Sequence, residues 1–316
     1  MRNLPLRVGT RGSPLARQQT ATFLRLLSTF CPVLKGMKVF EEHIIVTTGD
    51  EVQNRPLAEI GGKGLFAKEI HEQLLAGTID FAVHSLKDLE TVLPEGISLA
   101  CTLKREDARD ALILPAGTKI DPADPLAALK PGALIGSASV RRQAQMKYAR
   151  PDLNFTLLRG NVGTRLAKVE EGGLDATLLA YAGLKRLNLA HKASITLSPE
   201  QMVPAACQGI VGVTVRTDDT ELLTLLSAIE DPEAKAVSTA ERALLGALDG
   251  SCRTPIGGYA RLMGDGTLHL TGLVARADGS FLLQRSLTGK VTDAVNLGRT
   301  LGESLKADSP LDIFAP

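Results

Sequence analysis

The sequence lacks several features that define common protein classes. Its four cysteines are scattered and form no C-x-x-C pair, which argues against a zinc site or a disulfide framework and fits a reducing cytoplasm. The five histidines show no H-E-x-x-H spacing, so we interpret them as structural or surface residues and expect no metal. No apolar run approaches the roughly 18 residues of a membrane-spanning helix. Residues 1–10 lack the apolar core of a secretory signal, so a cytoplasmic protein is expected.

A large net charge is also missing. The 316 residues include 36 Lys and Arg against 35 Asp and Glu, which leaves a net charge of +1. Without a general basic surface, neither nucleic acid nor an anionic membrane is an expected partner. Any site for a small anion must therefore come from a local arrangement of cations. The hydrophobic content of 44% is that of a globular protein, and the length fits two or three domains.

The first two thirds of the chain alternate short apolar strands with helices. Ser13 offers an N-cap and Pro14 a first helical residue, so a helix is expected over residues 14–30. This alternation predicts mostly parallel sheets with helices on both faces. Residues 48–64 are polar and glycine-rich, which favours a loop that can move over a site. Strands are expected at 6–10, 39–47, 79–83, 111–114, 133–135, 155–158, 176–179 and 209–216, and further helices at 65–76 and from about 140 and 161.

The last quarter of the chain has a different pattern. Helices expected at 232–248 and 292–305 enclose three strands at 258–263, 268–275 and 281–287, which predicts a small α+β domain with an antiparallel sheet. We interpret residues 104–110 and 198–204 as crossings between two α/β units, with a hinge and a cleft between them. The predicted domains are residues 1–105 with 204–225, residues 106–203, and residues 226–316.

Cations recur where strands give way to helices. The N-terminal end of a helix carries partial positive charge, so a cation there costs about 0.3–1 kcal/mol. In α/β sheets these turns gather on one edge, where ligands bind, and arginine pairs well with carboxylate or phosphate. The pattern predicts an anion site, although each cation alone could be a solvated surface residue. The positions are Arg11, Lys63, Lys87, Arg141, Arg142, Arg159 and Arg165.

Two further residues carry possible chemistry. Asp88 follows the strand expected at 79–83, so it should face the same edge and stabilise a cation, or else form a structural ion pair. Cys252 lies between glycines and a proline, next to Arg253, and a neighbouring cation favours the reactive thiolate. The alternative is a buried, inert cysteine. Because no glycine-rich segment has a nucleotide-binding spacing, a ligand with several carboxylates is favoured over a phosphate.

A series of motifs follows one order along nearly the whole chain. They are Arg7-Val8-Gly9-Thr10-Arg11-Gly12-Ser13-Pro14-Leu15-Ala16, Gly61-Gly62-Lys63-Gly64-Leu65-Phe66, His84-Ser85-Leu86-Lys87-Asp88, Ser139-Val140-Arg141-Arg142-Gln143, Leu158-Arg159-Gly160-Asn161-Val162-Gly163-Thr164-Arg165-Leu166, Ala182-Gly183-Leu184-Lys185-Arg186-Leu187, Gln208-Gly209, and residues 250–258 around Cys252. Together they resemble the porphobilinogen deaminase family, also called the hydroxymethylbilane synthases.

The resemblance implies two periplasmic-binding-protein-like α/β domains and a smaller C-terminal α+β domain with a three-stranded antiparallel sheet. It also implies a transferase of haem (tetrapyrrole) biosynthesis that joins four porphobilinogen molecules head to tail, with loss of ammonia, to give hydroxymethylbilane. The growing chain is expected to hang from a dipyrromethane cofactor, made from the substrate and attached through a thioether to Cys252. Porphobilinogen is the expected small-molecule partner, and a monomer is expected.

The resemblance also implies roles for single residues. Asp88 is the expected catalytic residue, which stabilises the positive charge of the azafulvene left when ammonia departs and assists proton movements. The expected cofactor-binding residues are Lys87, Ser139, Arg141, Arg142 and Arg165. The expected substrate-binding residues are Arg11, Ser13, Lys63, Phe66, Arg159, Arg165, Arg186 and Gln208.

Some positions depart from the family pattern. Glu59 stands where lysine is frequent, Leu89-Glu90 where Val-Pro is usual, Ala138 where a hydroxyl residue is usual, and Cys207 where glycine is common. The main alternative function is a two-domain solute-binding or ligand-sensing protein for a polycarboxylate, because fold alone does not decide function. A nucleotide-binding transferase is disfavoured by the missing phosphate loop.

Overall fold

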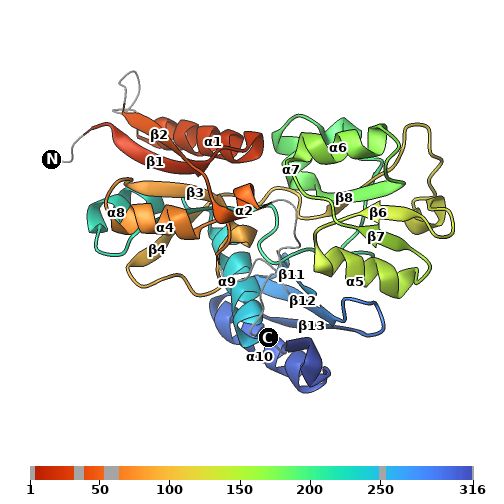
Figure 1. The fold of residues 1–316 in the computed structure, drawn as a ribbon. Coiled ribbons are helices and arrows are strands. Elements are labelled where there is room, and N and C mark those ends of the chain that lie inside the picture. Colours follow the sequence, from red (N-terminus) through yellow and green to blue (C-terminus); the bar gives the residue numbers. More distant parts are fainter. Residues whose placement is uncertain (1–3, 32–38, 53–63, 249–253, 315–316) are drawn as a thin grey trace. The chain divides into compact units, whose positions relative to one another are not determined.

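The computed structural model describes residues 4–31, 39–52, 64–248 and 254–314. These residues form two compact units (Figure 1). Among the described residues, one unit takes in residues 4–31, 39–52, 64–106 and 209–235, and the other takes in residues 107–208, 236–248 and 254–314. Within these ranges, no helix has the length and apolarity needed to cross a membrane. The limits predicted for three domains are not tested by this division and stay a prediction.

The first unit is built on a five-stranded sheet with the order β2-β1-β3-β10-β4. β1 pairs in parallel with β2 and β3, whereas β10 pairs antiparallel with β3 and β4. The strand expected at residues 209–216 is therefore present, as β10 of the first sheet. The strands are β1 (Leu6–Arg11), β2 (Phe40–Ile45), β3 (Phe81–Ser85), β4 (Ile97–Thr102) and β10 (Val211–Arg216).

Helices cover both faces of this sheet. Phe81 of β3 shares an apolar cluster with Phe23 of α1 and Leu226 of α8, whereas its neighbour Ala82 shares another with Ile70 of α4. Adjacent strand residues point to opposite faces, so α1 and α8 lie on one face and α4 on the other. The helices are α1 (Pro14–Phe30), α2 (Thr48–Glu51), α4 (Lys68–Leu75) and α8 (Thr220–Ser227), with a 3-10 turn η2 (Leu86–Asp88).

The second unit contains a five-stranded sheet with the order β7-β6-β8-β5-β9. β6 pairs in parallel with β7 and β8, and β5 pairs antiparallel with β8 and β9. Both large sheets therefore consist of three parallel strands followed by an antiparallel strand and an edge strand. The strands are β5 (Asp110–Ile113), β6 (Leu134–Gly136), β7 (Asn154–Thr156), β8 (Ala176–Ala180) and β9 (Ile195–Thr196).

This second sheet is also covered on both faces. Leu178 packs in one cluster with Met146 of α5, and the next residue, Leu179, packs in another with Leu166 of α6. Figure 1 shows α5 and α6 on opposite sides of the sheet. The helices are α5 (Val140–Ala149), α6 (Val162–Glu170) and α7 (Tyr181–Arg186), with 3-10 turns η3 (Pro125–Ala128) and η4 (Ala190–Lys192).

The C-terminal part of the second unit has the expected antiparallel sheet, in the order β11-β12-β13. Its two helices approach closely, because a Cβ atom on Gly298 would lie 2.2 Å from the carbonyl oxygen of Ala240. The elements are β11 (Ile256–Leu262), β12 (Thr267–Ala275), β13 (Leu282–Lys290), α9 (Pro232–Ala247) and α10 (Ala294–Ala307), with 3-10 turns η5 (Val291–Asp293) and η6 (Leu311–Phe314).

The fold class expected from the sequence is confirmed, but some local predictions are wrong. Residues 48–51, predicted as part of a loop, form the single turn α2, and residues 53–63 of that loop lie outside the described residues. α4 begins at Lys68 rather than at residue 65, because residues 65–67 form a turn after Gly64, which has a φ of +78°. The sheets also contain strands that the sequence analysis did not predict, β4 and β9.

A main-chain hydrogen bond joins the two segments where the chain leaves and re-enters the first unit. The amide of Glu106 donates to the carbonyl oxygen of Gly209 at 3.0 Å. Gly209 has a φ of +90°, and a Cβ atom there would lie 2.3 Å from the carbonyl oxygen of Glu106. The close approach of these segments therefore requires glycine at this position.

We expect the substitution Gly209→Ala to destabilise the protein more than Gly77→Ala. Gly77 also has a positive φ, +69°, but no atom lies within 4 Å of its hypothetical Cβ, so alanine there meets only the conformational cost of about 1–2 kcal/mol. Alanine at position 209 also clashes with the carbonyl oxygen of Glu106, so the free energy of unfolding should fall by about 3 kcal/mol or more. Urea unfolding measures the free energy of unfolding of both variants. Equal decreases would show that the two crossing segments move apart to accommodate alanine without an energetic cost.

Candidate active site

Arg11 is the last residue of β1, at the carboxyl edge of the first sheet. Its guanidinium forms a forked pair with Asp50, with Nε to Oδ2 at 3.1 Å and Nη2 to Oδ1 at 2.5 Å. Nη1 faces the Asp88 carboxylate, 3.8 Å away, and the ring of Phe66 lies 4.2 Å from the guanidinium carbon. The structure thus brings together three residues predicted to form the site, Arg11, Phe66 and Asp88, and adds Asp50.

The charges of this cluster stabilise one another. Burial disfavours the charged guanidinium, but the hydrogen bond to Asp50 and the attraction of Asp88 and Asp50 raise the pKa of Arg11 above its ordinary value. Burial likewise opposes ionisation of Asp50, yet the hydrogen bonds from Arg11 and Thr47 lower its pKa. Arg11 and Asp50 are therefore an ionised pair. Asp88 remains partly accessible, with 31% of its side chain exposed.

Polar side chains of α1 and β3 support the same edge. Ser13 caps α1, and its hydroxyl oxygen accepts the amide N–H of Ala16 at 3.2 Å. The side-chain amide of Gln19 exchanges hydrogen bonds with the hydroxyl of Ser85, at 2.9 Å and 3.2 Å. The sequence analysis did not single out Gln19 or Ser85, although Ser85 belongs to the motif that contains Asp88. Lys87 follows in η2 and is exposed.

Two histidines of the first unit are buried beside this edge, as the structural interpretation expected. The rings of His71 and His84 lie 5.8 Å apart, and His84 contacts the hydroxyl of Thr214 at 2.9 Å. Burial, with repulsion from His71 and Arg11, lowers the pKa of His84 to about 3. His84 is therefore neutral near neutral pH and adds no charge to the site.

Arg141 and Arg142, in the first turn of α5, are buried in the second unit around one carboxylate. Arg141 Nη2 lies 2.8 Å from Oδ2 of Asp110, and Arg142 donates through Nε and Nη2 to Oδ1 at 3.1 Å and 2.7 Å. Remaining donors reach the main-chain carbonyls of Val203 and Leu178. These arginines are thus neither solvated surface residues nor exposed cations, since only 5% and 6% of their surfaces are accessible.

Asp110 is the centre of this buried cluster. Burial opposes its charge, but the attraction of Arg141 and Arg142 and the hydrogen bonds from Arg142 and Gln208 hold the pKa of Asp110 well below its usual range. Gln208, predicted to bind substrate, is fully buried, and its side-chain amide donates to Asp110 and to the carbonyl of Ala108. Two guanidiniums against one carboxylate leave the cluster with a net positive charge.

The other residues predicted for the site in this unit follow its parallel strands. Ser139 caps α5 after β6, and its hydroxyl oxygen accepts the amide of Arg142 at 3.4 Å. Arg159 follows β7 and is partly exposed. Arg165 lies in α6, where its Nε donates to the carbonyl of Gly160 at 2.9 Å, and Arg186 ends α7 after β8. Ser139, Arg159 and Arg165 therefore follow the carboxyl ends of their strands closely, whereas Arg186 lies at the far end of its helix.

Two predicted residues, Lys63 and Cys252, lie outside the described residues, as does the departure at Glu59. At Cys207 the structure shows why glycine is common in the family. This residue has a φ of +63°, a conformation that glycine adopts more readily, and its amide donates to the buried carboxylate of Glu241 at 2.5 Å. Its side chain is buried, so its thiol is shielded from labelling reagents.

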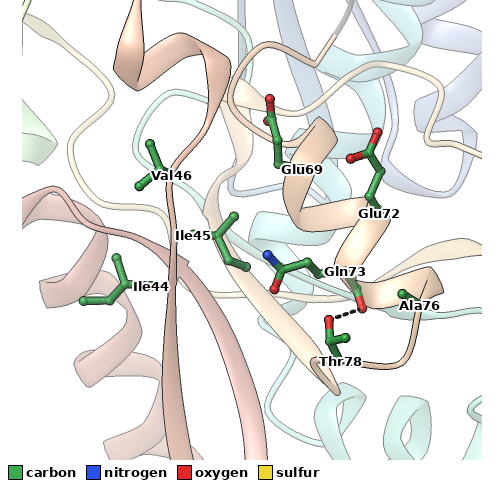
Figure 2. Close-up of a pocket in the computed structure, with 8 residues that line it drawn as sticks. All are labelled: Ile44, Ile45, Val46, Glu69, Glu72, Gln73, Ala76 and Thr78. Atoms are coloured by element: carbon green, nitrogen blue, oxygen red, sulfur yellow. Dashed lines mark hydrogen bonds between the residues drawn. The ribbon is translucent and has the colours of Figure 1, made fainter.

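A cavity of about 700 Å³ lies elsewhere in the first unit, between β2 and α4 (Figure 2). None of its lining residues belongs to the predicted site, and none of them is a cation. They are Ile44, Ile45, Val46, Glu69, Glu72, Gln73, Ala76 and Thr78. The carboxyl edges of the sheets, and not this cavity, therefore supply the cations for an anionic ligand.

Sequence reasoning missed the two carboxylates that pair with the arginines, Asp50 and Asp110. Asp50 follows the end of β2 as Asp88 follows β3, so the positional argument used for Asp88 could have found it. Asp110 begins the apolar strand β5, and a charged residue at the start of a fully buried strand was the available signal.

Comparison with known families and proteins gives consistent matches. Residues 6–224 match the family model "Porphobilinogen deaminase, dipyromethane cofactor binding domain", and residues 235–307 match "Porphobilinogen deaminase, C-terminal domain". A relative named porphobilinogen deaminase from Paracoccus denitrificans is 46% identical over 98% of this chain and 96% of its own length. The chloroplastic porphobilinogen deaminase of Oryza sativa is also 46% identical, over 98% of this chain and 85% of its own length.

Similar solved structures are more distant. The periplasmic VFT2 domain of Bordetella pertussis BvgS has a TM-score of 0.40 at 15% identity, over 74% of this chain and 92% of that one. A putative periplasmic sulfonate-binding protein SsuA from Methylobacillus flagellatus has a TM-score of 0.41 at 14% identity, over 75% of this chain and 66% of that one.

We expect Asp110→Asn to destabilise the protein by about 3–5 kcal/mol, because it leaves two buried guanidiniums without a counter-charge. Asp107→Asn is the matched control, since Asp107 forms a forked pair with Arg109 whose side chains are 21% and 41% exposed. That exposed pair should contribute less than about 1 kcal/mol. Denaturant unfolding of both variants checks the difference. Similar losses would mean that the buried cluster is not held by charge.

Proposed function

The chain belongs to the porphobilinogen deaminase family, and we propose that the carboxyl edges of its two large sheets hold the carboxylates of porphobilinogen and of the growing pyrrole chain. The enzyme is a hydroxymethylbilane synthase, a transferase of tetrapyrrole biosynthesis with a dipyrromethane cofactor. It joins four porphobilinogen molecules with loss of ammonia. The family matches do not favour the alternative of a solute-binding or sensing protein.

The placement of Asp88 is the observation that carries the proposal for the chemistry. Its carboxylate is partly exposed just after the end of β3, and the cation that faces it, Arg11, is already paired with Asp50. When the aminomethyl group of porphobilinogen leaves as ammonia, the pyrrole nitrogen acquires positive charge. A fixed carboxylate beside that ring stabilises the charge as it develops and accepts a proton from the nitrogen.

We assign the remaining cations to the substrate's acetate and propionate groups. Arg159 and Arg165 follow the carboxyl ends of strands of the second sheet, Arg159 is partly exposed, and Arg186 is the last residue of the helix after β8. Arginine is the side chain best matched to carboxylates through paired N–H donors. We also propose that Arg11, Ser13 and Phe66 of the first unit bind the substrate, together with Lys63. Linked pyrrole rings carry two carboxylates each, so several arginines are needed.

The residues proposed for the cofactor fit its negative charge in two ways. When bound, the dipyrromethane supplies the carbon to which the first substrate ring is joined, and its proposed attachment is a thioether to Cys252. Ser139 and Arg165 are partly exposed and could contact its carboxylates, as could the exposed Lys87. Arg141 and Arg142 are buried, so they would act through the net positive charge of their cluster with Asp110 at the start of α5.

We also propose a cytoplasmic location and a monomeric state, which were expected from the sequence. The described cysteines, Cys31, Cys101 and Cys207, form no disulfide with one another, which fits a reducing compartment. A monomer suffices because the product stays attached to one chain until it is complete. Gel filtration with light scattering tests the oligomeric state directly.

We expect the active protein to carry a dipyrromethane on Cys252. Intact mass spectrometry should show a mass above that of the bare chain, and peptide mapping should place the addition on Cys252. Cys252→Ser should abolish the addition and the activity, whereas the control Cys31→Ser should keep both. Active protein with the mass of the bare chain would contradict the assignment of the cofactor to this residue.

We expect Asp88→Asn to retain the cofactor but to lower kcat at least about 100-fold, because a neutral amide stabilises the developing cation poorly. Glu72→Gln is the control, since Glu72 is an exposed carboxylate of the same unit. Steady-state formation of hydroxymethylbilane measures the rates, and the mass measures the cofactor. A rate near that of the wild type would make Asp88 a structural residue.

A further inference from the structure

We propose that Asp50 is a positioning residue that neutralises and orients Arg11, so that Asp88 keeps an uncompensated negative charge for the substrate. This inference rests on the proposed function of Asp88. It concerns the carboxylate that follows β2, for which no catalytic part was predicted. Without Asp50, the positive charge of Arg11 would neutralise Asp88. Asp50 prevents this because its carboxylate pairs with the guanidinium instead.

The geometry of the guanidinium gives the first argument. Both N–H groups of its forked side, on Nε and Nη2, point to the two oxygens of Asp50 at 3.1 Å and 2.5 Å. The Asp88 oxygen lies farther away, 3.8 Å from Nη1. Forked pairing is the strongest arrangement that arginine makes with a carboxylate. Arg11 is therefore bound to Asp50 and only adjacent to Asp88.

The charge of the cluster gives the second argument. Arg11 contributes one positive charge, and Asp50 and Asp88 each contribute one negative charge, so the three residues together are negative. Their side chains are 21%, 29% and 31% exposed, so these charges are only partly screened by water. A negative cluster attracts the cation formed when ammonia leaves. An Arg11–Asp88 pair without Asp50 would be neutral and would lack this attraction.

The surroundings of Asp50 fix it in place. The hydroxyl of Thr47 donates to Oδ2 of Asp50 at 2.8 Å, next to the bond from Arg11. A Cβ atom on Gly49 would lie 2.2 Å from the ring of Phe66, so the backbone before Asp50 presses against the ring that also stacks on Arg11. Asp50, Phe66 and Asp88 thus hold the guanidinium from three directions.

The chain offers a matched control for the loss of such a pair. Asp80 makes the same forked contact with Arg7, with Nε to Oδ2 at 3.2 Å and Nη2 to Oδ1 at 3.0 Å. Arg7 lies near the amino end of β1, and Arg11 is at its carboxyl end. Asp50→Asn and Asp80→Asn therefore each remove the carboxylate charge from one arginine–aspartate pair. The two arginines lie near opposite ends of the same strand, β1.

The test compares cofactor-loaded Asp50→Asn, Asp80→Asn and wild-type enzyme with porphobilinogen as substrate. We expect Asp50→Asn to lower kcat at least 10-fold per cofactor-loaded molecule without raising KM, because the neutralised cluster still binds carboxylates but no longer stabilises the cation. Asp80→Asn should keep both constants within about 2-fold. An unchanged kcat in Asp50→Asn, or an equal fall in Asp80→Asn, would overturn the inference.

A second readout follows Arg11 without using activity. In ¹⁵N spectra of the loaded protein, the Arg11 Nε–H should exchange slowly with water in the wild type and at least 10-fold faster in Asp50→Asn. If Asp50→Asn does not load cofactor, the milder Thr47→Val, which removes one hydrogen bond to Asp50, should lower kcat in the same direction with KM unraised. A raised KM with an unchanged kcat in Thr47→Val would contradict the inference.

The two proposals fail in different ways. Wild-type protein that makes no hydroxymethylbilane from porphobilinogen would end the proposed function. Active wild-type protein with a fully active Asp50→Asn variant would end only the role given to Asp50.

Discussion

In each of the two units, the pairing of arginine with aspartate at the carboxyl ends of parallel strands stabilises the group of candidate site residues. Cations that gather at one sheet edge repel one another, and each also opposes the positive end of the helix that follows it. In the first unit Asp50 forms an ion pair with Arg11. In the second unit Asp110 forms ion pairs with both Arg141 and Arg142. The charges cancel in neither cluster, because Asp88 leaves the first with a net negative charge and the second arginine leaves the other with a net positive charge.

This difference in sign matches the roles that we propose for the two clusters. The cluster of the first unit is negative and includes the partly exposed Asp88, which suits the cation formed as ammonia leaves. The buried cluster of the second unit is positive and lies at the start of α5, which suits the carboxylates of the pyrrole chain. Two sheets with the same strand order thus present opposite charges from equivalent edges.

Local patterns were sufficient for much of the fold. α1 has the limits that its cap and its proline predicted, Pro14 to Phe30, and the three strands of the C-terminal sheet were found within a few residues. The short edge strand β9 was missed, because its two residues are too few to show the alternating pattern of a strand. The ordered motifs pointed to the family that the full-length matches then showed.

The sequence by itself determined where strands end, which residues cap the helices and which cations follow the strands, because these depend on neighbours a few residues away. Only the tertiary structure decided which carboxylate each arginine pairs with and which arginines are buried. Asp50 is separated from Arg11 by 39 residues, and Asp110 from Arg142 by 32. Such pairs form when strand order brings distant segments to one sheet edge, and the energy of a charge depends on its distance through space and its exposure to water.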